Sequence, residues 1–210
     1  MKEHKFSRQE ALSFGWQTMK KKFWFLVGVL LFSGVLYIVP SAIADLAKKR
    51  SLTAVSVIFN IIYIILAYIV QMGMMGISLK LCDGQPAKVS DLFAYVNKFL
   101  KYIAASILYG LIVLGGTILL IVPGIIWGIQ FGFYGYAIVD KDIGPVNALK
   151  QSSRMTYNAK WDLAIFGLLV FLINLLGILC LLLGLFATLP ATMIASAFVF
   201  RQLEKSTHGV

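Results

Sequence analysis

The chain has 210 residues, of which 60% are hydrophobic and only 13% are charged, and its formal net charge at pH 7 is +10. Soluble globular domains are about half apolar and about one quarter charged, so this composition excludes water as the solvent for most of the surface. The length has room for six membrane spans and short tails, and we expect no separate soluble domain.

The basic residues are grouped in a way that predicts a topology. Sixteen of the 19 Lys and Arg residues fall in the N-terminal tail, in 80–101, in 141–160 and in the tail from Arg201, which six crossings place on one side. Lys and Arg collect on the cytoplasmic side of membrane proteins, so both termini are expected to be cytoplasmic. The Lys48–Arg50 cluster opposes this rule. We assign the positive charge to orientation and to anionic lipid headgroups, not to nucleic acid.

The N-terminal segment has the pattern of a basic amphipathic helix. Ser7 and Glu10 have the spacing of a capping box. The apolar positions that follow share one helical face: Leu12, Trp16, Met19 and Phe23. A basic helix that ends in tryptophan is typical of the bilayer interface, so we expect headgroup contacts from Lys20, Lys21, Lys22 and Trp24. The alternative is a soluble helix that packs on a partner.

Two spans follow this first elbow. The first is expected at 23–39, with Pro40 ending or kinking it. Its flanks imitate a signal peptide, but the lead and the apolar run are too long for one, so we expect the segment to be retained. The second is expected at 52–79, which exceeds the ~20 residues that cross a bilayer and predicts tilt or protrusion. Asn60 and Gln71 are expected to bond across helices or, alternatively, to form a substrate site.

A second elbow is predicted where Ser90 and Asp91 cap another amphipathic segment. Its apolar positions lie 80 residues after those of the first elbow: Leu92, Val96, Phe99 and Ile103. The shared spacing before an apolar run indicates an internal repeat, with units at 7–80, 90–140 and 145–203.

The middle hairpin is expected as spans 102–122 and 124–139, with the turn at Pro123 and Gly124. The returning helix carries a stripe of small residues at Gly124, Gly128, Gly132 and Gly135. Helices in lipid approach closely where side chains are absent, so we expect this helix at the centre of the bundle. Gln130 lies off the stripe and is expected to hydrogen-bond to a neighbour.

The third elbow begins at Pro145, a residue favoured in the first turn of a helix. Polar residues replace the apolar face of the first elbow, at Ser153, Thr156 and Lys160. Either protein covers them, or the elbow binds a headgroup, phosphate or partner. The candidate contact residues are Lys150, Ser152, Arg154, Asn158 and Trp161. A third interpretation is a solvated connector that Arg154 ties to Asp140 or Asp142.

The last hairpin is predicted from 38 uncharged residues between Asp162 and Arg201. As one helix they would be nearly twice as long as the hydrocarbon core is thick, so the chain must double back. We expect the turn near Leu183–Phe186, spans at 162–182 and 187–203, and Pro190 in the first turn of the last span. Asn174 is its polar intramembrane residue.

The second half of the chain resembles a bacterial membrane-protein family. The resemblance rests on Ile121–Gly124, Asp140, Ala148–Ser152 with Trp161, and Phe198–Arg201. It is similar to the YciC-like proteins and to the membrane domain of glycerophosphoryl diester phosphodiesterases. This resemblance implies a six-span inner-membrane protein of largely unknown function. The phosphodiesterase domain of the fused members has no counterpart in 210 residues, so their activity is not implied.

The expected fold is an all-α polytopic bundle of three hairpins, each preceded by an amphipathic interfacial helix. No motif for a nucleophile, a phosphate loop or a metal is present, so we expect no enzyme, no cofactor and no metal site. The leading hypothesis is a module that binds anionic lipid, a membrane-protein partner or a second copy through its elbows. The alternatives are a passive channel, in which Asn60, Gln71, Gln130 and Asn174 converge, and an intramembrane enzyme that uses Asp140 or Asp162.

Overall fold

The computed structural model describes residues 6–180 and 183–208, and its secondary structure there is helical without strands. The α-helices are α1 (Arg8–Lys21), α2 (Phe23–Lys49), α3 (Thr53–Cys82), α4 (Phe99–Leu119), α5 (Ile121–Phe131), α6 (Tyr134–Lys141), α7 (Pro145–Thr156), α8 (Lys160–Leu179) and α9 (Leu185–His208). Two short 3₁₀ helices, η1 (Val89–Phe93) and η2 (Val96–Lys98), lie between α3 and α4.

Six helical stretches of the described chain are long and apolar enough to cross a membrane. They are Phe23–Lys49, Thr53–Cys82, Val89–Leu119, Ile121–Lys141, Lys160–Leu179 and Leu185–Thr207. Only 11% of the most apolar 18-residue segment of Thr53–Cys82 is buried inside the protein, so most of its apolar surface needs a non-aqueous solvent. The chain is therefore a multi-pass membrane protein.

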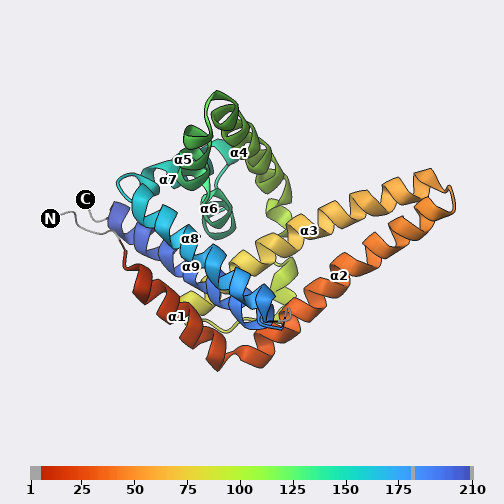
Figure 1. Ribbon diagram of the computed structural model, residues 1–210, viewed down its shortest axis with the longest axis horizontal. Coiled ribbons are helices and arrows are strands. Elements are labelled where there is room, and N and C mark those ends of the chain that lie inside the picture. Colours follow the sequence, from red (N-terminus) through yellow and green to blue (C-terminus); the bar gives the residue numbers. More distant parts are fainter. Residues whose placement is uncertain (1–5, 181–182, 209–210) are drawn as a thin grey trace.

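Consecutive apolar helices pack against each other (Figure 1). Contacts join α2 with α3, α4 with α5, and α8 with α9. The far end of the α2–α3 pair reaches away from the other helices, whereas α1 runs along α9. α9 contacts five helices, namely α1, α2, α3, α7 and α8.

The core lies around α9 rather than around the returning helix of the middle hairpin. One cluster of buried side chains includes Tyr102, Ile138 and Phe200, and a second joins Val29, Ile194 and their neighbours. In the most apolar 18-residue segment of Leu185–Thr207, 50% is buried inside the protein, against 28% in the corresponding segment of Ile121–Lys141. The predicted central position is therefore wrong for 124–139 as a whole, although Tyr136–Val139 in α6 is buried.

The first span was expected at 23–39 with Pro40 ending or kinking it, but α2 does not end there and continues to Lys49 with Pro40 inside it. A proline removes one helical hydrogen bond without ending a helix when other groups satisfy the freed backbone. The second span agrees closely, since α3 begins at Thr53 and ends at Cys82. It extends three residues beyond the expected end at residue 79.

The middle hairpin turns earlier than expected and its second helix is broken. Leu120, not Pro123, is extended between α4 and α5, with φ −164° and ψ 146°. Pro123 lies in the first turn of α5, where a missing N–H is tolerated. The expected continuous helix 124–139 is interrupted between Phe131 and Tyr134, and the third span begins at Phe99 instead of residue 102.

The second elbow is not a regular amphipathic helix but the two 3₁₀ helices. The Asp91 carboxylate accepts hydrogen bonds from the Lys88 N–H at 2.8 Å and from Lys80 Nζ at 2.7 Å, which holds a tight turn. A Cβ added at Gly73 in α3 would collide with the backbone of Leu92, so this turn is pressed onto α3. The three repeat units stay a prediction.

The last hairpin also turns earlier than expected. α8 ends at Leu179 and α9 already begins at Leu185, which places Pro190 in the second helical turn instead of the first. The last two residues of the predicted span 162–182 lie outside the described residues. α9 continues to His208, beyond the expected end at residue 203.

Candidate functional site

The break between α5 and α6 is closed by hydroxyl groups from α7. The Phe133 N–H donates to Ser152 Oγ at 3.1 Å. The Gln130 carbonyl accepts from Ser152 Oγ at 2.9 Å and from Thr156 Oγ1 at 3.0 Å. Both hydroxyl residues are 0% exposed. These bonds give partners to backbone groups that the broken helix leaves unpaired. Backbone N–H and C=O groups away from water require such partners.

The side chain of Gln130 is held by the same elbow. Its Nε2 donates to Ser153 Oγ at 2.6 Å, and its Oε1 accepts from Lys160 Nζ at 2.7 Å. The predicted hydrogen bond from Gln130 to a neighbour is confirmed. The polar positions Ser153, Thr156 and Lys160 thus face protein, which explains why this elbow lacks the apolar face of the first.

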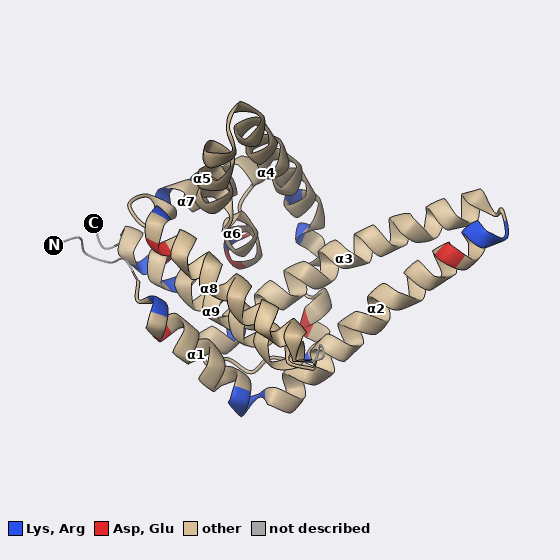
Figure 2. Cartoon of the chain, viewed as in Figure 1, with Lys and Arg blue, Asp and Glu red and all other residues tan. Residues whose placement is uncertain are grey.

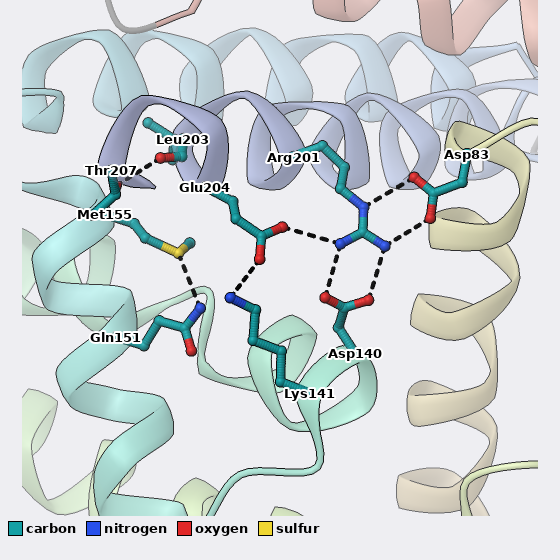
Figure 3. A network of polar contacts seen from close by, with 9 residues as sticks. All are labelled: Asp83, Asp140, Lys141, Gln151, Met155, Arg201, Leu203, Glu204 and Thr207. Carbon is teal, nitrogen blue, oxygen red and sulfur yellow. Dashed lines mark hydrogen bonds and ion pairs between the residues drawn. The ribbon is translucent and has the colours of Figure 1, made fainter. Parts of the chain in front are cut away.

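An ion-pair network joins α3, α6 and α9 around Arg201 (Figure 3). Arg201 forms a bidentate pair with Asp140, with both nitrogen–oxygen distances at 2.8 Å. It donates from Nε and Nη2 to Asp83 at 3.0 and 2.7 Å. Glu204 accepts from Arg201 at 3.1 Å and from Lys141 at 2.5 Å. The Arg201 side chain is only 20% exposed, and its charge-assisted hydrogen bonds join α9 to the C-terminal ends of α3 and α6.

The expected tie from Arg154 to Asp140 or Asp142 is wrong. Arg201 holds Asp140, and Lys101 contacts the Asp142 carboxylate at 3.0 Å. The hydrogen bond from Lys101 lowers the pKa of Asp142 below its usual value. Asp140 and Arg201 both belong to the segments that resemble the bacterial family, but their positions in the sequence do not indicate that they pair.

A pocket of about 310 Å³ lies between α6, α7 and α9. It is lined by Lys141, Ile143, Asn147, Lys150, Gln151, Arg154, Met155, Glu204 and Thr207. Of the five predicted contact residues of this elbow, it includes Lys150 and Arg154. Ser152 lies instead against the α5–α6 break, and Asn158 and Trp161 are exposed outside the lining. We name this cavity the α7 pocket.

A second pocket of about 610 Å³ lies at the junction of α1 and α2. Its lining is Trp16, Met19, Lys20, Lys21, Lys22, Phe23, Trp24, Phe25 and Ala187. It contains all four residues predicted to contact headgroups at the first elbow. Trp24 is 82% exposed, and Lys20 Nζ lies 5.4 Å from the centre of the Trp16 ring. We name this site the α1–α2 groove.

One face of α1 packs on protein. Its buried residues are Ala11, Gly15 and Met19, and α9 is its main neighbour. Ser7 accepts the Glu10 N–H at 3.3 Å and caps the helix. Another side of α1 is not covered by the described part of the protein, and Trp16 is 42% exposed there.

The glycines of the middle hairpin serve different neighbours. A Cβ at Gly124 would collide with Thr117 of α4, and the hydroxyl of Tyr109 in α4 donates to the Gly128 carbonyl at 3.2 Å. Gly132 lies at the helix break. A Cβ at Gly135 would lie 2.9 Å from Met75 of α3 and 3.0 Å from Tyr102 of α4. The residues form two contact sites, not one continuous stripe.

Three of the four intramembrane amides hydrogen-bond to separate partners in the described chain, and the fourth, Gln71, is exposed. Asn60 donates to the Ser56 carbonyl of its own helix at 2.8 Å. Asn174 in α8 donates to Thr192 Oγ1 in α9 at 3.2 Å, and Gln71 is exposed on α3. Gln130 binds the third elbow, as described above. No hydrogen bond within residues 6–180 and 183–208 joins two of these amides.

Residues 93–206 match the family described as "Domain of unknown function (DUF7847)". The matched part contains the α5–α6 break and every lining residue of the α7 pocket except Thr207, together with Asp140 and Arg201. No curated protein and no solved structure matches the chain.

Proposed function

We propose that this chain, which belongs to the DUF7847 family, is a membrane module that binds anionic lipid through its basic elbows and has no catalytic role of its own. The observation that carries this proposal is the α1–α2 groove. Three lysines and an exposed tryptophan meet there at the beginning of a long apolar helix. Cations and tryptophan together are the side chains that suit the headgroup region of a bilayer.

The topology that we propose has three hairpins whose elbows share the cytoplasmic face of an inner membrane, with both termini on that face. The distribution of charge supports it (Figure 2). The Lys48–Arg50 cluster lies at the far tip of the α2–α3 pair, whereas the other basic residues of the described chain lie away from this tip. In this arrangement the elbows all reach the same anionic leaflet.

The contacts of the polar residues favour binding over the alternatives. A channel or carrier would need Asn60, Gln71, Gln130 and Asn174 around one path, but their contacts are separate. Of the two candidates for intramembrane chemistry, Asp140 is engaged by Arg201 in an ion pair, and Asp162 lies 3.9 Å from Arg8 Nε. A membrane-protein partner or a second copy could use the same elbows, and the test below distinguishes lipid from these.

The test measures lipid selectivity at Trp24. Trp16, Trp127 and Trp161 are replaced by Phe, and the protein is reconstituted with brominated phosphatidylglycerol or brominated phosphatidylcholine, which quench tryptophan fluorescence. Each lysine near an anionic surface contributes about 1 kcal/mol, about fivefold in affinity. We expect Trp24 to prefer phosphatidylglycerol at least fivefold, and the triple variant K20Q/K21Q/K22Q to lose this preference.

The matched control is K48Q/K49Q, which removes lysines at the far tip of the α2–α3 pair. It should retain the preference of the parent protein. Equal quenching by the two lipids in the parent protein, or an unchanged preference in the triple variant, contradicts lipid binding at the α1–α2 groove.

A further inference from the structure

The α7 pocket presents one polar face of a helix. Asn147, Lys150, Gln151 and Arg154 follow the i, i+3, i+4, i+7 spacing that places side chains on the same side of α7. The opposite side of α7 is fixed by the bonds of Ser152 and Thr156 to the α5–α6 break. Because these bonds prevent the helix from turning, Lys150 and Arg154 are held toward the pocket.

The charges in the lining leave the pocket positive. Lys141, Lys150 and Arg154 face a single carboxylate, Glu204, so the formal charge of the lining is +2. Glu204 is already shared between Lys141 and Arg201. No ion pair to Lys150 or Arg154 occurs within the described residues. Two cations of one helix face are therefore available to an anion.

The pocket lies where headgroup phosphates are found if the candidate spans cross a bilayer. Lys141 is the last residue of the stretch Ile121–Lys141, and Thr207 is the last of Leu185–Thr207. Ile143 and Met155 add apolar surface beside the cations. A volume of about 310 Å³ is at the lower end of small-molecule pockets, which suits a phosphate group with a short substituent.

We propose that the α7 pocket binds a phosphate-bearing anion, with Lys150 and Arg154 as its ligands. Arg154 supplies the planar pair of N–H donors that matches two phosphate oxygens, and Lys150 supplies a point charge. The phosphate belongs either to a lipid headgroup or to a soluble molecule. If the phosphate belongs to a lipid, this inference rests on the function proposed above; if it belongs to a soluble molecule, it does not. The α1–α2 groove lies at a different elbow, so the two sites can be tested separately.

The experiment uses the full chain in maltoside micelles, which contain no phosphate. Native mass spectrometry measures retention of phosphatidylglycerol, and calorimetry measures binding of inorganic phosphate. We expect one saturable site for at least one of these probes. K150Q/R154Q should weaken it at least tenfold, since it removes two charge-assisted contacts. R154K, which keeps the charge but loses the paired donors, should give an intermediate loss.

The outcomes separate the two sources and the two sites. Binding of phosphatidylglycerol alone identifies a lipid headgroup, and binding of inorganic phosphate alone identifies a soluble anion. K20Q/K21Q/K22Q should leave this site intact even if it abolishes lipid selectivity at Trp24. Absence of binding by both probes, or equal affinity of the parent protein and K150Q/R154Q, overturns the proposal. Lys150 and Arg154 are exposed, and the thermal transition of each variant checks that it is folded.

Discussion

Arg201 links α3, α6 and α9 through ion pairs. It binds three carboxylates, of Asp83, Asp140 and Glu204, and its side chain is mostly removed from solvent. The pairing itself need not stabilise the fold more than apolar packing would, because burial of charge is costly. Loss of one partner is different, since it leaves the remaining charges without compensation.

Arg201→Gln should therefore lower the stability of the protein in detergent by about 2–4 kcal/mol, because it leaves three carboxylates close together without their shared cation. Thermal unfolding followed by intrinsic fluorescence measures the loss. Lys101→Gln is the control: it removes a cation whose pair with Asp142 is about half exposed, and such pairs contribute at most about 1 kcal/mol. Equal transitions for the two variants would refute the central role of Arg201.

Single residues show what sequence reasoning reaches. Amides in apolar helices commonly hydrogen-bond to a neighbouring helix, so a bond from Gln130 was predictable. Its partners Ser153 and Lys160 were not, because the fold brings them from 23 and 30 residues away. The pairing of Asp140 with Arg201 was missed for the same reason.

At the scale of elements, α1 is held by protein on one side and exposes its other side. Gly15 is the point of closest approach, because a Cβ there would collide with the Ala191 carbonyl and lie 3.0 Å from Ala195 Cβ. One face of α1 therefore packs on α9 of the same chain, and the position of its exposed face in the bilayer interface stays a prediction.

Gly15→Val should separate α1 from α9 and destabilise the protein by about 1–3 kcal/mol, as overpacking at a close contact does. The measurement is the thermal transition together with protease sensitivity of the first 22 residues. Gly28→Val is a matched control, because nothing lies within 4 Å of a Cβ at Gly28. A transition for Gly15→Val that coincides with that of Gly28→Val would show that α1 is not packed at Gly15.

The number of apolar helices was predictable, but their ends were not. Runs of apolar residues longer than a bilayer is thick must cross or double back, which follows from length alone. The ends depend on contacts that length does not encode. Pro40 is accommodated inside α2, the turn falls at Leu120, and η1 replaces a helical turn because Asp91 binds Lys80 and Lys88.

For the whole molecule, the central claim is that three helical pairs cross the membrane from one face, which carries the basic elbows. In this arrangement the α1–α2 groove and the α7 pocket lie on the same side of the membrane, as the proposed lipid binding by the basic elbows assumes. The Lys48–Arg50 cluster at the tip of α2 and α3 must then lie on the opposite face.

Cysteine accessibility tests this claim most directly. Single cysteines at Ser51, Lys88 and Lys150, in a chain with Cys82 and Cys180 replaced by Ala, are labelled with an impermeant maleimide in intact cells and in inverted vesicles. The account predicts that Ser51→Cys reacts only in intact cells, and that Lys88→Cys and Lys150→Cys react only in inverted vesicles. Labelling of Lys88→Cys and Lys150→Cys from opposite faces, or of all three from one face, would contradict it.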